Sequence, residues 1–109
     1  MEVIWSDLAL QDLTEIAEYV SENFGDRVAY TSVEKLQEKV SRLKLFPESG
    51  VLDRKLSSLD FSVHHLIVEP NVIYYLLETD RIVVMTILHT KRSTRFVNSV
   101  LKRFLEHYE

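Results

Sequence analysis

The sequence contains no cysteine among its 109 residues. Disulfide bonds, thiolate nucleophiles and cysteine-based zinc sites are therefore excluded, and we expect the chain to act in a reducing cytoplasm. The longest uncharged run of the C-terminal half, Ile82 to Thr90, is far below the ~20 apolar residues that span a bilayer, so we expect no membrane partner. Glu2 and Asp7 interrupt the N-terminal apolar residues, and we expect no secretory signal.

Glycine and proline are also scarce, with two of each. Their positions therefore divide the chain clearly: Gly25 is placed to end a helix in a left-handed conformation, and Pro47 to stop a second helix before a turn that contains Gly50. The 46% hydrophobic and 28% charged content excludes a disordered chain. At this length we predict one domain, residues 1–109.

One segment of the chain has no basic residue and another has no acidic residue, and the net charge of −4 does not show this separation. Residues 1–26 have no Lys or Arg but seven acidic residues: Glu2, Asp7, Asp12, Glu15, Glu18, Glu22 and Asp26. Residues 81–103 have no acidic residue but six basic ones: Arg81, Lys91, Arg92, Arg95, Lys102 and Arg103. Either the two segments neutralise each other within the fold, or the basic one is reserved for an anionic partner.

Apolar residues recur at helical spacing in three segments. The first contains Ala9, Leu13, Ile16, Ala17, Val20 and Phe24; the second Ala29, Val33, Leu36, Val40, Leu43 and Phe46; the third Phe96, Val97, Val100, Leu101, Phe104, Leu105 and Tyr108. Ser6 is placed to cap the first helix. Asp12, Glu15, Glu18 and Glu22 lie off its apolar stripe, so we expect them to face water. The short connection between the first two segments predicts an antiparallel helical hairpin.

Strand patterns occupy the rest of the chain. Met1 to Trp5 predicts a short strand, and Phe61 to Val68, Val72 to Leu77 and Ile82 to Leu88 predict three more, the last two joined by a tight hairpin. Those two are apolar on both faces, which indicates central strands covered by helices. The predicted fold class is α+β: an N-terminal helical hairpin packed on a small twisted antiparallel sheet, with a C-terminal helix.

Several of these segments, in this order, resemble the RelE/ParE superfamily of type II toxin–antitoxin toxins. The resemblance is carried by Trp5-Ser6-x-x-Ala9-x-x-Asp12-Leu13-x-x-Ile16-x-x-Tyr19-Val20, by Ala29 through Leu43 followed by Phe46-Pro47-x-x-Gly50, and by Val72-Ile73-Tyr74-Tyr75 and Ile82 to His89 followed by Lys91-Arg92. It spans about residues 1–92. No single motif is specific, whereas their order and spacing together are.

The resemblance implies a compact toxin that a cognate antitoxin protein neutralises. ParE-like members inhibit DNA gyrase without cleaving nucleic acid, and RelE-like members cleave messenger RNA on the ribosome. The helical pair and its Pro-x-x-Gly turn look more like the ParE side, and many superfamily members have an Arg in the first long strand, where this chain has His64 and His65. A ParE-like gyrase inhibitor is therefore the favoured prediction; a ribosome-dependent endoribonuclease and a non-toxic binding module are the alternatives.

The end of the last predicted strand carries the candidates for RNA cleavage. His89 is the candidate acid or base, with Lys91 or Arg92 stabilising phosphate charge, if the chain is RelE-like. At ~3.3 Å per strand residue, Arg81 lies ~26 Å from His89 and cannot serve the same phosphate, whereas Lys91 can. The alternative is that His89 only bonds to the backbone and that both cations are solvated.

Other residues are candidates for contact with a protein or nucleic-acid partner: His64, His65, Tyr75, Arg81, Arg95, Lys102 and Arg103. Tyr74 and Tyr75 are alternatively ordinary sheet packing. His64 and His65 point to opposite faces of a strand and cannot chelate one ion, so we expect no metal site, and we expect no cofactor. The sequence leaves open which of the two faces each histidine occupies, and it leaves the oligomeric state undefined.

Overall fold

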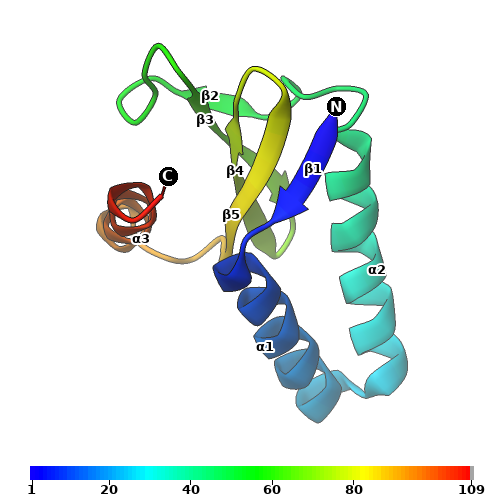
Figure 1. Cartoon of the computed structure of the whole chain (residues 1–109). Coiled ribbons are helices and arrows are strands. Elements are labelled where there is room, and N and C mark those ends of the chain that lie inside the picture. The colour runs from blue at the N-terminus through cyan, green and yellow to red at the C-terminus, as the bar shows by residue number, and fades with distance from the viewer. Residues whose placement is uncertain (109) are drawn as a thin grey trace.

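Residues 1–108 are described by a computed structural model, in which three helices and five strands form one unit (Figure 1). The elements are β1 (Glu2–Trp5), α1 (Asp7–Phe24), α2 (Asp26–Arg42), β2 (Val51–Asp53), β3 (Ser62–Val68), β4 (Asn71–Leu77), β5 (Arg81–His89) and α3 (Thr94–Glu106). All three predicted helices and all four predicted strands are confirmed. β2 was not predicted, because three residues are too few to show a strand pattern.

The five strands form one sheet in the order β1-β5-β4-β3-β2. β2, β3, β4 and β5 pair antiparallel, whereas β1 lies parallel to β5, with Val3 opposite Ile82. The α+β prediction is confirmed, but the sheet is mixed rather than wholly antiparallel. The cause is the long helical connection after β1, since a parallel pair needs such a connection and a tight turn cannot provide it.

The N-terminal helices form the predicted hairpin with a single residue between them. Ser6 caps α1, since its Oγ accepts a hydrogen bond from the Ala9 N–H at 3.0 Å. Gly25 ends α1 with φ +93° and ψ 164°, a conformation that is essentially restricted to glycine, and α2 begins at the next residue. Ser6 therefore caps α1 as predicted, and Gly25 ends it at the predicted residue, with a positive φ but with a ψ outside the left-handed helical conformation.

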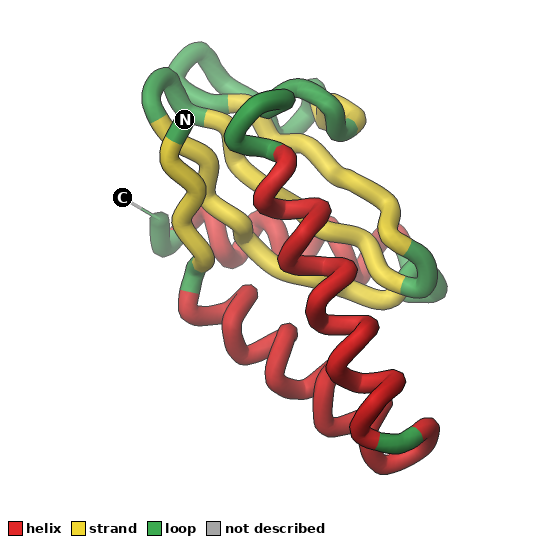
Figure 2. The backbone as a smooth tube through the Cα atoms, turned by 90° about the vertical axis from the view of Figure 1, so that its right-hand side faces the viewer, coloured by secondary structure: helices red, strands yellow, loops and turns green. Residues whose placement is uncertain are grey.

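Helices cover both faces of the sheet (Figures 1 and 2). α1 and α2 lie on one face, where Ala9 and Leu36 pack against Ile73 and Val84. α3 lies on the other face, where the buried Leu101 packs against Met85. The distal part of the hairpin extends beyond the edge of the sheet (Figure 2). No helix within residues 1–108 combines the length and apolar character that membrane crossing requires.

Candidate functional site

His89 lies at the exposed end of β5, opposite Asn71 of β4. Its Nδ1 accepts a hydrogen bond from the Lys91 backbone N–H at 3.0 Å, which leaves Nε2 as the ring nitrogen free for other partners. The side chain borders an open cleft of about 340 Å³ between β5 and α1. The cleft is lined by Asp12, Glu15, Ile16, Tyr19, Val20, Asn71, Ile87, Leu88, His89 and Arg92.

Lys91 and Arg92 are both exposed immediately after His89. The Arg92 guanidinium lies over the Phe96 ring, 4.5 Å from its centroid, an arrangement favoured by the negative potential of an aromatic face. The three residues predicted for RNA cleavage thus leave the sheet at one place. However, the His89 ring is bonded to the main chain and the Arg92 side chain rests on an aromatic ring, so a catalytic role for these residues stays a prediction.

Asp12 joins α1 to β5 and is half-buried. Its position off the apolar stripe had led us to expect a residue that only faces water. Its Oδ2 accepts hydrogen bonds from the Thr86 hydroxyl and, at 2.9 Å, from the Ile87 N–H. The pairing of β4 with β5 shifts by one residue here, between Tyr74 and Tyr75. β1 pairs with β5 only from Arg81 to Val84, so within residues 1–108 Ile87 has no partner strand on that side, and the Asp12 carboxylate accepts its N–H. No local sequence signal indicates this contact.

Tyr75 is fully buried and presents no surface to a partner. Its hydroxyl donates to the Pro47 carbonyl at 2.8 Å and accepts from the Gly50 N–H at 2.9 Å. Burial raises the pKa of the Tyr75 phenol, and the hydrogen bond from Gly50 opposes that rise. A Cβ at Gly50 would lie 2.7 Å from the Tyr75 hydroxyl oxygen and 2.7 Å from the His65 carbonyl oxygen. Tyr75 therefore fixes the turn at Pro47–Gly50.

His64 and His65 occupy opposite faces of β3. His64 is buried on the helical-hairpin side and stacks on Tyr75, with ring centroids 5.1 Å apart and an interplanar angle of 9°. Its Nδ1 lies 3.3 Å from the Gly50 carbonyl oxygen. His65 is half-buried on the α3 side, beside Tyr74, whose pKa is raised by burial. Of the two histidines, only His65 has appreciable surface for a partner.

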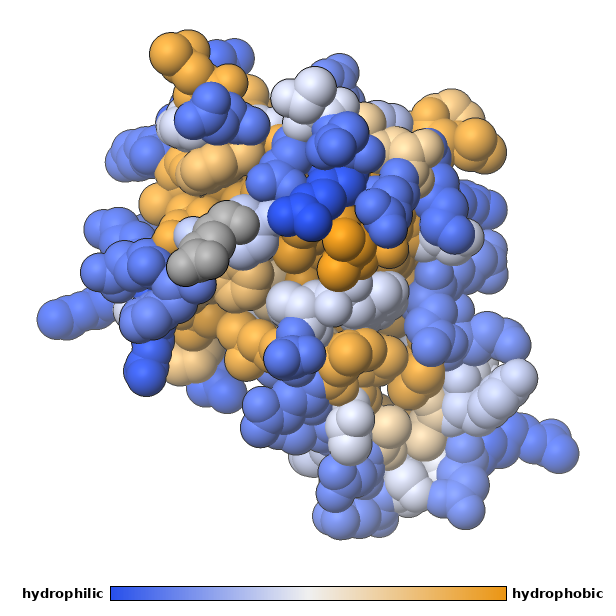
Figure 3. Space-filling view, viewed as in Figure 1, coloured by the Kyte–Doolittle hydropathy of each residue, from blue (hydrophilic) through white to orange (hydrophobic). Residues whose placement is uncertain are grey.

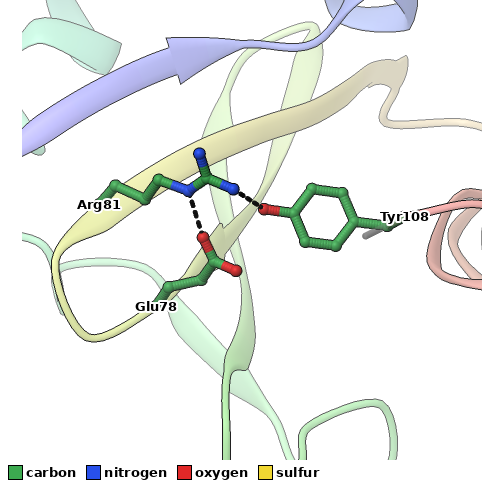
Figure 4. Close-up of polar contacts among 3 residues, drawn as sticks. All are labelled: Glu78, Arg81 and Tyr108. Atoms are coloured by element: carbon green, nitrogen blue, oxygen red, sulfur yellow. Dashed lines mark hydrogen bonds and ion pairs between the residues drawn. The ribbon is translucent and has the colours of Figure 1, made fainter.

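Arg81 lies at the opposite end of β5 from His89 and anchors the C-terminal end of α3 (Figure 4). Its Nε donates to a Glu78 carboxylate oxygen, and its Nη2 donates to the Tyr108 hydroxyl at 2.8 Å. The hydrogen bond to Glu78, and then that to Tyr108, raise the pKa of Arg81 above its ordinary value. Burial is the first cause that raises the pKa of Tyr108. The Arg81 guanidinium is thus already engaged within the chain.

The remaining cations of the C-terminal segment are exposed. We call Lys91, Arg92, Arg95, Lys102 and Arg103 the basic face. Within residues 1–108 the ion pairs are Glu38–Arg42 and Glu78–Arg81, so none joins the acidic N-terminal segment to the basic face. Glu15 and Arg92 do line the same cleft. The space-filling view shows hydrophilic residues over the outer side of α3 and apolar residues between α3 and the strands (Figure 3).

Comparison with known proteins identifies the family. The sequence model of the ParE toxin of the type II toxin–antitoxin system parDE matches residues 3–94. The chain belongs to the ParE toxin family. The ParE assignment covers β1 through the first residue of α3, and therefore includes the His89 cleft and excludes most of the basic face. It confirms the predicted superfamily and the predicted ParE-like side of it.

The ParE-like fold is also found among solved structures. One of them, titled "Chromosomal ParDE TA system from P. aeruginosa", superposes with a TM-score of 0.67 at 22% sequence identity, over 82% of this chain and 95% of that one. At this identity the match supports the ParE-like fold and not a shared partner. A search of curated proteins finds no match. Within residues 1–108 no group of three metal-ligating side chains gathers that could hold an ion.

Proposed function

We propose that this ParE-family toxin arrests growth by binding DNA gyrase, and that a cognate antitoxin neutralises it. Membership of the ParE toxin family supports the assignment of the chain as the toxin of a type II toxin–antitoxin system. The observation that carries the proposal is the basic face, where five exposed cations make no ion pair within residues 1–108. Exposed cations that make no ion pair raise the rate and specificity of association with an anionic macromolecular surface.

The arrangement at His89 favours action by binding over action by catalysis. A ribonuclease needs a proton acceptor and a cation that converge on one phosphate. Here Nδ1 of His89 accepts from the backbone, and the Arg92 guanidinium rests on Phe96 rather than beside the imidazole. His89, Lys91 and Arg92 therefore contribute to the proposed contact surface as a donor and two positive charges.

Gyrase inhibition tests the proposal directly. Purified protein at micromolar concentration should inhibit the supercoiling of relaxed plasmid by gyrase, with no cleavage of nucleic acid by the protein alone. The triple substitution Arg95→Glu, Lys102→Glu and Arg103→Glu should weaken inhibition by at least about tenfold, because it reverses the sign of the contact surface. The matched control, Arg27→Glu, Lys44→Glu and Arg54→Glu, changes the charge equally at exposed positions elsewhere.

Other outcomes would replace the proposal. Absence of inhibition, together with mapped cuts in ribosome-bound transcripts that disappear on His89→Ala, would identify the RelE-like endoribonuclease. Its supporting observation is that His89, Lys91 and Arg92 lie together beside the open cleft. Expression without harm to the host would instead indicate a non-toxic binding module. In growing cells, filamentation would favour gyrase, and arrest of translation would favour the ribosome.

A further inference from the structure

α1 carries a row of carboxylates along its solvent-facing side. Glu15, Glu18 and Glu22 follow one another at spacings of three and four residues, which places them on one flank of the helix. We call these three residues the acidic row. All three are exposed, and within residues 1–108 none of them forms an ion pair. Like charges at these spacings repel one another and destabilise a helix, so the row is unfavourable for α1 by itself.

Three cations lie across the His89 cleft from the acidic row. Lys91, Arg92 and Arg95 are exposed, form no ion pair within residues 1–108, and are called here the basic rim. Glu15 lines the cleft from α1, and Arg92 lines it from the segment that connects β5 to α3. That segment leaves the sheet beside the start of α1 (Figure 1). The surface around this cleft is therefore negative on one side and positive on the other.

Both groups of charges also oppose the dipoles of their helices. A helix favours cations at its C-terminus and anions at its N-terminus. The last turn of α1 contains Glu22 and no basic residue. The first turn of α3 contains Arg95 and no acidic residue. Opposite charges supplied from outside the chain would relieve the unfavourable arrangement at both helix ends.

Two exposed aromatic side chains lie among these charges. Tyr19 lines the cleft and is 62% exposed. Phe96 is 38% exposed and supports the Arg92 guanidinium on its ring. Tyrosine and arginine are enriched among the residues that dominate the binding energy of protein interfaces. The surface thus combines aromatic area with charges of both signs, a composition that suits a protein partner.

We propose that this surface binds a second copy of the same chain in a two-fold symmetric dimer. A surface with a negative half and a positive half is complementary to itself, because a two-fold axis along the cleft places the acidic row of each copy against the basic rim of the other. A nucleic acid or a uniformly acidic protein would satisfy only the basic rim and would be repelled by the acidic row. The dimer conceals three of the five cations of the basic face. That it thereby withholds the toxin from gyrase rests on the proposed function, whereas the self-association does not.

Sedimentation velocity of the purified full-length chain tests the inference. Between about 1 µM and about 1 mM, the native chain should shift from monomer to dimer. The dissociation constant should rise severalfold between about 0.05 M and about 0.5 M salt, because salt screens exposed charges. Glu15→Lys with Glu18→Lys should weaken association at least about tenfold, since the substituted row then faces the cations of the basic rim. Arg92→Glu with Arg95→Glu should do the same from the other half.

An equimolar mixture of these two variants is the sharpest measurement. One variant then carries cations on both halves of the surface and the other carries carboxylates on both halves, so a heterodimer should form with an affinity within about threefold of the native homodimer. The Glu15/Glu18 variant has no formal net charge, because two reversals add four units to −4. Overall attraction between the two chains therefore cannot explain the restored association, and restoration also shows that both variants are folded.

A matched control uses acidic residues outside this surface. Glu34→Lys with Glu48→Lys makes the same change in net charge at exposed positions and should leave association within about twofold. A native chain that stays monomeric at every concentration would overturn the inference. So would equal weakening by the control pair, or a mixture of the two interface variants that stays monomeric. Gyrase inhibition is measured separately, so its failure alters none of these readouts.

Discussion

The carboxylate of Asp12, on α1, accepts a hydrogen bond from the hydroxyl of Thr86, on β5, 74 residues later in the chain. The same carboxylate oxygen accepts the Ile87 N–H. One side chain thus satisfies the backbone of β5 beyond the last residue that pairs with β1, and it fixes α1 against the strand that ends at His89. Asp12 therefore supports the candidate site in addition to lining its cleft.

Replacing Asp12 should destabilise the fold. Asp12→Ala leaves the part-buried Ile87 N–H without its acceptor, and hydrogen bonds to a charged group contribute about 1.5–3 kcal/mol each. We expect a loss of about 2–3 kcal/mol in the free energy of unfolding, measured by urea denaturation. Glu15→Ala, one turn further along α1 on its exposed side, is the matched control and should change stability by less than about 0.5 kcal/mol. Equal effects of the two substitutions would contradict the structural role of Asp12.

The turn at Pro47–Gly50 should depend on one hydroxyl. Tyr75→Phe removes the acceptor of the Gly50 N–H and the donor to the Pro47 carbonyl while keeping the buried ring. We expect a loss of about 1–2 kcal/mol in the free energy of unfolding and faster amide exchange at Gly50. Tyr74→Phe, at the neighbouring position on the other face, should have a smaller effect. The prediction fails if Gly50 exchanges no faster in the Tyr75 variant.

Stability should also fall at alkaline pH. Burial raises the pKa of the Tyr75 phenol above its ordinary value of 10.0, so the folded state retains a proton that the unfolded state loses. The contribution is complete below pH 10 and is lost as the pH rises through the pKa of the folded state. We expect the free energy of unfolding to decline less steeply above about pH 10 in Tyr75→Phe than in the native chain. Tyr19→Phe, at an exposed position, should leave the slope unchanged.

Local patterns were sufficient to predict all three helices and every strand except β2. The stripe from Ala9 to Phe24 produces α1, the Ser6 hydroxyl caps it, and Gly25 ends it. The two-faced apolar strands β4 and β5 indeed lie inside the sheet. These features depend on side chains within a few residues of each other, where helical and strand periodicity determine which face is buried.

Contacts between distant segments were not predictable in the same way. Asp12 has the spacing of a solvent-facing residue, and only the position of Thr86 explains its burial. The parallel placement of β1 depends on where the helical hairpin returns the chain. The charge pattern of the sequence left open whether the acidic and basic segments neutralise each other or the basic one is reserved for a partner. The positions of α1 and α3 were needed to show that, within residues 1–108, the basic face makes no ion pair with the acidic N-terminal segment.

The C-terminal end of α3 should loosen when its link to the β4–β5 turn is removed. Tyr108→Phe deletes the acceptor of the Arg81 Nη2–H but keeps the ring that stacks on Phe104, with centroids 5.6 Å apart. Because the Arg81 side chain is 35% exposed, we expect only a small loss in the free energy of unfolding. Amide exchange in the last turn of α3 should accelerate several-fold, with little change in α1. Tyr30→Phe, at an exposed position on α2, is the control. Acceleration spread evenly over all three helices would mean that the Arg81–Tyr108 bond stabilises the fold globally and does not specifically anchor α3.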